Sequence, residues 1–424
     1  MTNINGQSAP GNHEDFNEGQ FFFNRSEYQD ALFFYLKLVE HDSMNANFNF
    51  KIGECYLNMP GKEYLAVPFF GKSILNLVPK KKYNKKDINE RNAPLHALFY
   101  LGNAYRMDNQ LNKALDCYAK FMDSPYFWGN YNQEVVEQEI KSCERAKVIQ
   151  DAPIDLEKIN LGPAINSTFS EEMPVVSGDG NTLVFLRHLK FYNAVFYSVK
   201  VNNAWREAVN INPEIISDGD FYATGLSFDG SKLLLIKKDS DNSEIYISYL
   251  KNDVWSKAAL LENKINSSHN VTFGSFGPNE KSIYLSGNRG GRGDFDIYVS
   301  KITSNGSWGR PKALGRPINT EFDEQNPILC SKGEVLFFAS RGQFSMGGYD
   351  IFYSYLSEGK WSLPVNIGYP INDTRDNMLF YPTEQCRNGY MAINDSTGYG
   401  ESDIYLVTIK SKSVLNLEKI NGDK

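Results

Sequence analysis

The chain has 424 residues and a net charge of −7, with 41% hydrophobic and 22% charged residues, which is typical of a globular protein. This length exceeds the roughly 250 to 300 residues that one hydrophobic core supports, so at least two domains are expected. The acidic balance gives no reason to expect nucleic acid as a partner, and no apolar run approaches the roughly 18 residues of a membrane helix.

The first residues, MTNINGQSAPGNHED, are polar and lack a charged-then-apolar signal pattern, so residues 1–14 are predicted to be a disordered tail. From residue 15 to 150 the spacing becomes helical. Three segments repeat a Gly followed by an Ala 12 or 13 residues later, with large aromatic residues between and after them. Small residues at such offsets let two antiparallel helices approach closely. The pairs are Gly19 and Ala31, Gly53 and Ala66, and Gly102 and Ala114.

The third segment, YLGNAYRMDNQLNKALDCYAKF at Tyr100 to Phe121, resembles the tetratricopeptide repeat. Three repeats need a cap, and the helical pattern from Asn132 to Gln150 is expected to supply it. The resemblance implies a concave face on the first helix of each pair. There, Asn side chains would bond the backbone of an extended peptide and aromatic rings would hold its apolar groups, although ordinary surface groups are the alternative. The expected partner-binding residues are Phe23, Asn24, Asn47, Phe50, Asn58, His96, Phe99, Asn103 and Arg106.

A basic run, KKKYNKK at Lys80 to Lys86, separates the second and third helical segments. Such a run could bind phosphate or an acidic partner. We favour a solvated loop that lengthens one helix connection.

Asp151-Ala-Pro153 interrupts the helical pattern, which predicts a domain boundary there and a second domain over residues 151–424. This part repeats a Gly-rich turn, an Asp-Ile-aromatic step, a Trp and a Gly-x-Pro-Ile-Asn step. Asp296 and Asp350 lie 54 residues apart, and Trp308 and Trp361 lie 53 apart. A period near 50 with four short strands per unit is typical of a β-propeller. The turn before the second strand is placed at Gly180, Gly230, Glu280, Gly333 and Gly389, which favours five blades, six remaining possible.

The fifth copy has no Trp after Asp403-Ile404-Tyr405, whereas Ile154 to Asn166 resembles a fourth strand that has no blade before it. We therefore predict that the start of this domain closes the ring, because an open ring would expose sheet edges. Leu415 to Asn421 nearly repeats Asp155 to Asn160 and could occupy the same edge.

The repeats GSWGRPKALGRPINTEFDEQNP and GGYDIFYSYLSEGKWSLPVNIGYPIN resemble the TolB-type, WD40-like propeller repeat. Together with the helical repeats, they are similar to PorE-like cell-envelope proteins of the Bacteroidota associated with type IX secretion. That resemblance implies a periplasmic or outer-membrane-associated protein. Members commonly carry a signal segment and an OmpA-like domain. Neither is present here, so peptidoglycan binding is not carried over, and membrane association is expected only through partners or a missing anchor.

No catalytic, metal or cofactor site is expected. The five cysteines, Cys55, Cys117, Cys143, Cys330 and Cys386, are odd in number and far apart, which favours buried free thiols over disulfides or zinc. The histidines, His13, His41, His96, His188 and His269, match no catalytic or metal motif.

Three site-like motifs are assigned to turns. Arg292–Asp294 has the sequence of an integrin-binding tripeptide but lies where a hairpin loop recurs. Asp239 to Glu244 lacks the Gly and distal Glu of a calcium loop. The recurring Asp296, Asp350 and Asp403 are expected to anchor turns through backbone hydrogen bonds.

The sequence thus predicts an α+β multidomain chain, tetratricopeptide helices followed by an all-β propeller. The expected function is a non-enzymatic scaffold that binds other envelope proteins or peptides. The alternative is a propeller that binds or cleaves glycans, which would need convergent acidic, Arg or His side chains at the inner strands.

Overall fold

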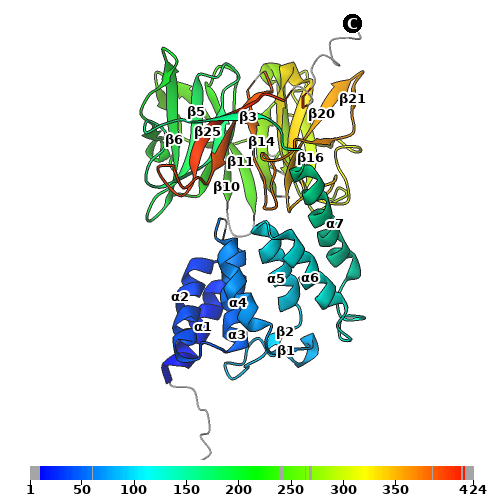
Figure 1. Cartoon of the computed structure of the whole chain (residues 1–424). Coiled ribbons are helices and arrows are strands. Elements are labelled where there is room, and N and C mark those ends of the chain that lie inside the picture. Colours follow the sequence, from blue (N-terminus) through cyan, green and yellow to red (C-terminus); the bar gives the residue numbers. More distant parts are fainter. Residues whose placement is uncertain are drawn as a thin grey trace, which may run out of the picture. The chain divides into compact units, whose positions relative to one another are not determined.

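The computed structural model describes residues 10–59, 61–238, 242–262, 264–266, 270–383, 385–411 and 414–415. The chain divides into two compact units, a helical unit, Met1–Val148, and a propeller unit, Ile149–Lys424 (Figure 1). No helix within the described ranges is both long and apolar enough to cross a membrane.

The helical unit is built from consecutive antiparallel helix pairs, each packed against the next. Its helices are α1 (Pro10–Asn24), α2 (Tyr28–His41), α3 (Ala46–Leu57), α4 (Ala66–Ser73), α5 (Ala97–Met107), α6 (Leu111–Met122) and α7 (Gln133–Gln150). The predicted tail over residues 1–14 is wrong at residues 10–14, which form the start of α1. Pro10 suits this position because proline lacks the N–H that a first helical turn leaves unbonded. Residues 1–9 lie outside the described part.

Each helix pair is fixed by a glycine that faces an aromatic ring. A Cβ at Gly19 would lie 2.6 Å from Tyr35, and one at Gly102 would lie 2.4 Å from Tyr118. In the middle pair, the corresponding distance from Gly53 to Phe70 is 2.6 Å. These contacts confirm that the small residues allow close helix approach.

A long connection joins α4 to α5 and is tied at its base. Strands β1 (Leu77–Val78) and β2 (Ala93–Pro94) pair in parallel, Leu77 with Ala93 and Val78 with Pro94. The chain between them begins with a short 3-10 helix, η2 (Lys80–Lys82). The 14 residues of this excursion, 79–92, are called the crossing segment below.

The propeller unit contains five antiparallel sheets among its described residues, as the favoured blade count predicts. In three of the first four blades the outer strand is split into two short pieces, the first of which ends at the Trp. The first blade contains β4 (Ser170–Val176), β5 (Thr182–His188), β6 (Asn193–Val201), β7 (Ala204–Trp205) and β8 (Val209–Asn210), and the second contains β9 (Phe221–Leu226), β10 (Lys232–Lys238), β11 (Ser243–Lys251), β12 (Val254–Trp255) and β13 (Ala259–Leu260). The third blade contains β14 (Val271–Phe276), β15 (Ser282–Gly287), β16 (Asp296–Lys301) and β17 (Lys312–Ala313), and the fourth contains β18 (Glu324–Cys330), β19 (Val335–Ser340), β20 (Asp350–Ser357), β21 (Lys360–Trp361) and β22 (Val365–Asn366). The fifth blade contains β23 (Tyr381–Pro382), β24 (Asn388–Ile393), β25 (Asp403–Ile409) and β3 (Leu156–Asn160).

The blades form a closed ring. The innermost strands β4, β9, β14, β18 and β23 contact one another in sequence, and β23 contacts β4 again. The predicted closure by the start of the domain is confirmed, because β3 pairs with β25 from Tyr405–Asn160 to Ile409–Leu156. Leu415 is buried beneath this region, and the remainder of Leu415 to Asn421 lies outside the described residues.

In four of the five blades an asparagine brackets one residue of the third strand and holds that strand in place. Asn319 accepts a hydrogen bond from Ile297 N and donates one to Ile297 O. The Asn of each Pro-Ile-Asn step therefore acts as a side-chain bracket on the neighbouring strand. Equivalent brackets are formed by Asn166 on Ile404, Asn266 on Ile245, and Asn372 on Ile351.

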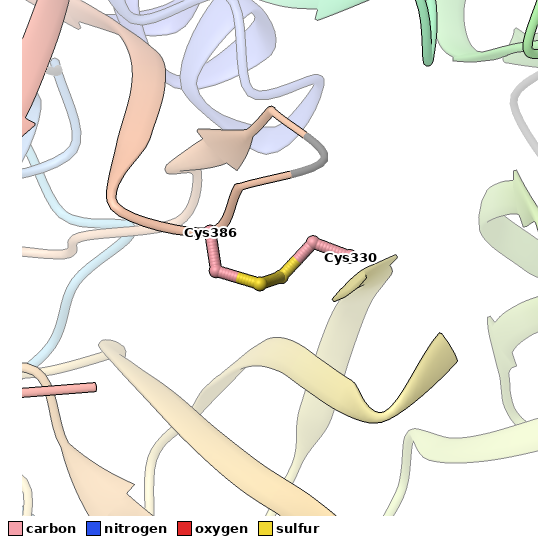
Figure 2. Close-up of a disulfide and its surroundings, with 2 residues drawn as sticks. All are labelled: Cys330 and Cys386. Carbon is pink, nitrogen blue, oxygen red and sulfur yellow. A yellow bond between two sulfur atoms is a disulfide. The ribbon is translucent and has the colours of Figure 1, made fainter. Parts of the chain in front are cut away.

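The prediction of five free cysteines is wrong for two of them. Cys330 and Cys386 form a disulfide with a Cα–Cα distance of 5.6 Å (Figure 2). Cys330 ends β18, and Cys386 lies in the turn before β24, so the ring brings together residues 56 apart in the sequence. Cys386 has a φ of 62° and marks the turn that was predicted at Gly389, which lies inside β24 instead. The free and buried state of Cys55, Cys117 and Cys143 is confirmed.

Candidate functional site

The nine predicted partner-binding residues lie on α1, α3 and α5 or at their ends, but they do not form one surface. Asn24 and Asn58 are exposed, and Phe23, His96, Phe99 and Asn103 are half-buried. Asn47, Phe50 and Arg106 are buried. Their burial corrects the expectation that these three side chains are presented to solvent.

The three predicted residues within α5 face other helices. Asn103 Oδ1 accepts a hydrogen bond from Tyr118 on α6 at 2.8 Å, and Phe99 packs against the same ring. Arg106 is paired with Glu139 on α7 at 2.9 Å. Phe99, Asn103 and Arg106 therefore hold the helical unit together.

Phe23, near the end of α1, and Asn58, at the end of α3, make contacts with residues close to them in the sequence. Phe23 packs edge-on against Tyr28, with ring centroids 5.4 Å apart. Asn58 Nδ2 donates to Glu54 O in its own helix at 2.8 Å.

Asn47, Phe50 and His96 come together, and they do so around a residue that the sequence analysis did not single out. Tyr83 of the crossing segment donates to Asn47 Oδ1 at 2.7 Å. Its ring meets Phe50 edge-on with centroids 6.1 Å apart, and Phe50 meets His96 at 5.5 Å. Burial, with a contribution from Lys80, lowers the pKa of His96 to about 4, so the imidazole is neutral at pH 7.

The crossing segment runs over the helices in the order α5, α3, α1. Near its start, Lys80 Nζ lies 6.0 Å from the ring of Tyr131, which in turn contacts His96 at the start of α5. Tyr83 contacts α3 as described above. Beyond it, Lys85 O accepts a hydrogen bond from Gln20 on α1.

The far end of the segment is anchored more firmly. Ile88 is buried in a cluster with Phe16 of α1 and with Phe48 and Ile52 of α3. Arg91 pairs with Asp42 at 2.5 Å, and its carbonyl accepts from Ala46 N at 3.2 Å. The lysines are exposed, as a solvated loop predicts, but Tyr83 and Ile88 tie the loop to the helices.

The helix face under the segment carries two charged side chains of opposite sign. Lys51 is 6% exposed, with its Nζ 5.3 Å from the centroid of Phe16 and 5.6 Å from that of Tyr35. Burial lowers the pKa of Lys51 and raises that of Glu54, and the charge of Lys85 on the segment opposes the rise at Glu54. We call this face of α1, α3 and α5 the groove, which is lined by Gln20, Asn47, Phe50, Lys51, Glu54 and, at the start of α5, His96.

The recurring carboxylates of the propeller unit serve its turns. Asp350 Oδ2 accepts from Met346 N at 2.8 Å, and Asp403 Oδ2 accepts from Tyr399 N at 2.7 Å. Asp296 accepts from Arg292 N at 2.5 Å in the loop that carries Arg292–Asp294. The prediction that these aspartates anchor turns is confirmed.

Two buried glutamates, Glu324 and Glu171, also stabilise turns by accepting hydrogen bonds. Glu324 accepts from Thr320 N and Oγ1, and Glu171 accepts from Ser167 N and Oγ. Burial raises the pKa of both, to about 7 for Glu324. Arg187 pairs with Glu171 at 2.6 Å.

Metal and histidine motifs gain no support from the described part of the chain. Its His, Cys, Asp and Glu side chains form no group of three that could hold a metal ion. His188 bonds Glu172 Oε2 at 3.0 Å, which raises the pKa of its imidazole. His269 and residues 239–241 of the calcium-like stretch lie outside the described residues.

No protein-family model matches the chain, and no curated protein sequence matches it. Among solved structures, TolB from Acinetobacter baumannii is 16% identical, with a TM-score of 0.37 over 58% of this chain and 56% of that one. A putative TolB from Agrobacterium tumefaciens is 11% identical, with a TM-score of 0.36 over 60% of this chain and 98% of that one. The catalytic domain of the GH62 alpha-L-arabinofuranosidase of Coprinopsis cinerea is 9% identical, with a TM-score of 0.37 over 61% and 98%. TolB-type propellers are thus among the structural neighbours, and the chain matches little more than half of the Acinetobacter protein.

Proposed function

We propose that the chain is a non-enzymatic scaffold that binds other proteins of a bacterial cell envelope through its helical unit. The observation that carries the proposal is the groove, which already holds the crossing segment of the chain by its aromatic and amide side chains. Binding of extended peptides to such a face uses the same contacts.

A finer assignment rests on the sequence resemblance to PorE-like proteins with tetratricopeptide and TolB-type repeats. It suggests a component of type IX secretion in a member of the Bacteroidota. The disulfide Cys330–Cys386 supports an extracytoplasmic location, because disulfides persist in the periplasm and are rare in the cytosol. Cell fractionation combined with thiol labelling of the native protein tests this location.

Site-specific photo-crosslinking in the native cell tests the scaffold function. The exposed Asn24 and Asn58, at the ends of α1 and α3, are suitable probe positions, and Lys120, with 62% of its side chain exposed on α6, is the matched control. The proposal expects a defined protein adduct from Asn24 or Asn58 and none from Lys120. Hydrolysis of envelope glycans by the purified chain, without such adducts, would favour the glycan-cleaving alternative.

A further inference from the structure

The crossing segment lies in the groove as a bound peptide would. It contacts α1 and α3 at Tyr83, Lys85 and Ile88, and Tyr83 also packs against the apolar cluster that includes Ala97 and Leu101 of α5. An ordinary connection between neighbouring helices has roughly 2 to 8 residues, and this one has no need to reach α1 in order to join α4 to α5. The contacts along its path therefore indicate which side chains the groove can bind.

The contacts define a chemical preference. An aromatic hydroxyl meets the buried amide of Asn47 while the ring meets Phe50 edge-on. An aliphatic side chain, Ile88, enters the apolar space between α1 and α3. A basic residue, Arg91, pairs with Asp42 at 2.5 Å. The groove thus selects a segment with an aromatic residue, an aliphatic residue five positions later and a basic residue three positions after that.

The side-chain amide of Asn47 has a hydrogen-bond donor, Nδ2, that the crossing segment does not use. The side chain of Asn47 is 0% exposed, and within the described part of the chain its Nδ2 has no hydrogen-bond acceptor. A buried donor of this kind is destabilising when it is left unsatisfied. A ligand that offers a carbonyl or carboxylate oxygen to Asn47 Nδ2 would bind this groove better than the chain's own segment does.

Few backbone hydrogen bonds tie the segment to the helices. Its described residues make one backbone hydrogen bond to a helix, from Ala46 N to Arg91 O, and its ends are held by the β1–β2 pair. Its turns are stabilised internally, as where Glu90 accepts from Asn84 N and Asn92 N. A tethered segment of this length competes at an effective concentration in the millimolar range, which lowers the apparent affinity of any outside ligand.

We propose that the groove of α1, α3 and α5 is a binding site for a partner segment that carries an aromatic, an aliphatic and a basic residue at the spacing of Tyr83, Ile88 and Arg91, and that residues 79–92 occupy it in cis until the partner displaces them. The inference rests on the proposed scaffold function and names the class of partner. The crossing segment occupies the site in place of the ligand, so its composition indicates which residues the ligand carries.

The direct test removes the segment from the chain and adds it back as a separate peptide. In an open-groove variant, residues 80–91 are replaced by a Gly-Ser linker, and the probe is a fluorescent peptide of residues 79–92, PKKKYNKKDINERN. Fluorescence anisotropy should show at least roughly tenfold tighter binding to the open variant than to the native chain. Asn47→Leu in the open variant should reverse the gain. A scrambled peptide of the same charge is the control.

Equal binding of the probe and its scrambled control to a folded open variant, or no gain over the native chain, would overturn the inference. So would preferential binding of an acidic peptide. If the open variant does not fold, hydrogen exchange on the native chain decides. The amides of residues 79–92 should exchange at least a hundredfold faster than those in the middle of α3, and equal protection would contradict displacement. Failure of these tests leaves the crosslinking result from Asn24 and Asn58 as a separate measure of the scaffold function.

Discussion

The side-chain amide of Asn166 brackets the backbone of Ile404, 238 residues further along the chain, with Nδ2 donating to Ile404 O at 3.0 Å and Oδ1 accepting from Ile404 N at 2.8 Å. Asn372 makes the same two bonds to Ile351 within one blade, only 21 residues away. The closure of the ring is therefore one more copy of a blade's own geometry, made by a strand from the other end of the unit.

Asn166→Ala should destabilise the propeller by about 2 to 4 kcal/mol, because two buried backbone groups lose their partners. Asn372→Ala is the matched control and should cost a similar amount in urea unfolding. Only Asn166→Ala should speed hydrogen exchange in β3, since β3 is joined to its blade through space and not through a hairpin. Equal exchange of β3 in both variants would show that Asn166 has no special part in ring closure.

Reduction of the Cys330–Cys386 disulfide should lower the free energy of unfolding of the propeller by about 2 to 4 kcal/mol, because the crosslink closes a long loop in the unfolded chain. Urea titrations with and without reductant measure this. The double variant Cys330→Ser, Cys386→Ser should match the reduced native chain and be insensitive to reductant. An unchanged midpoint on reduction would contradict the prediction.

Glu324 should make the propeller less stable as pH rises from about 4.5 to 7. Its pKa is about 7 in the folded chain against an ordinary value of 4.5, so the unfolded state loses the proton first and the stability held at low pH is lost. The full effect is about 3 kcal/mol. Glu324→Gln should flatten the profile, because an amide can still accept from Thr320 N and donate to the hydroxyls. Glu321→Gln, an exposed neighbour, should not.

Gly53→Ala should destabilise the helical unit by about 1 to 3 kcal/mol, because the new methyl group would lie 2.6 Å from the buried ring of Phe70. Gly71→Ala in α4 is the control. Its Cβ would meet nothing within 4 Å, so the better helix propensity of alanine should leave stability unchanged or raise it slightly. Thermal unfolding of the two variants compares them directly.

The propeller could be predicted because each blade repeats local signals, such as the aspartates at Asp296 and Asp350 that bond their own turns. Ring closure could be predicted because Ile154 to Asn166 carries a complete outer-strand pattern without a blade before it. The disulfide could not, since nothing in the local sequence of Cys330 or Cys386 tells that adjacent blades place them together.

The groove was predicted only in part. Repeat spacing places residues on a helix, but it does not reveal that the excursion before α5 covers α3 and buries Asn47 and Phe50. The available signal was composition: Tyr83 and Ile88 are isolated apolar residues in an otherwise polar stretch. Such residues in a long connection indicate that the connection packs against something.

The groove account is tested most directly by photo-crosslinking from Asn58 in the native cell, comparing the native chain with the open-groove variant. The account predicts the same partner adduct in both, with a higher yield once the crossing segment is removed, and no adduct from Lys120. An adduct that disappears when the segment is removed, or that forms equally from Lys120, would contradict it.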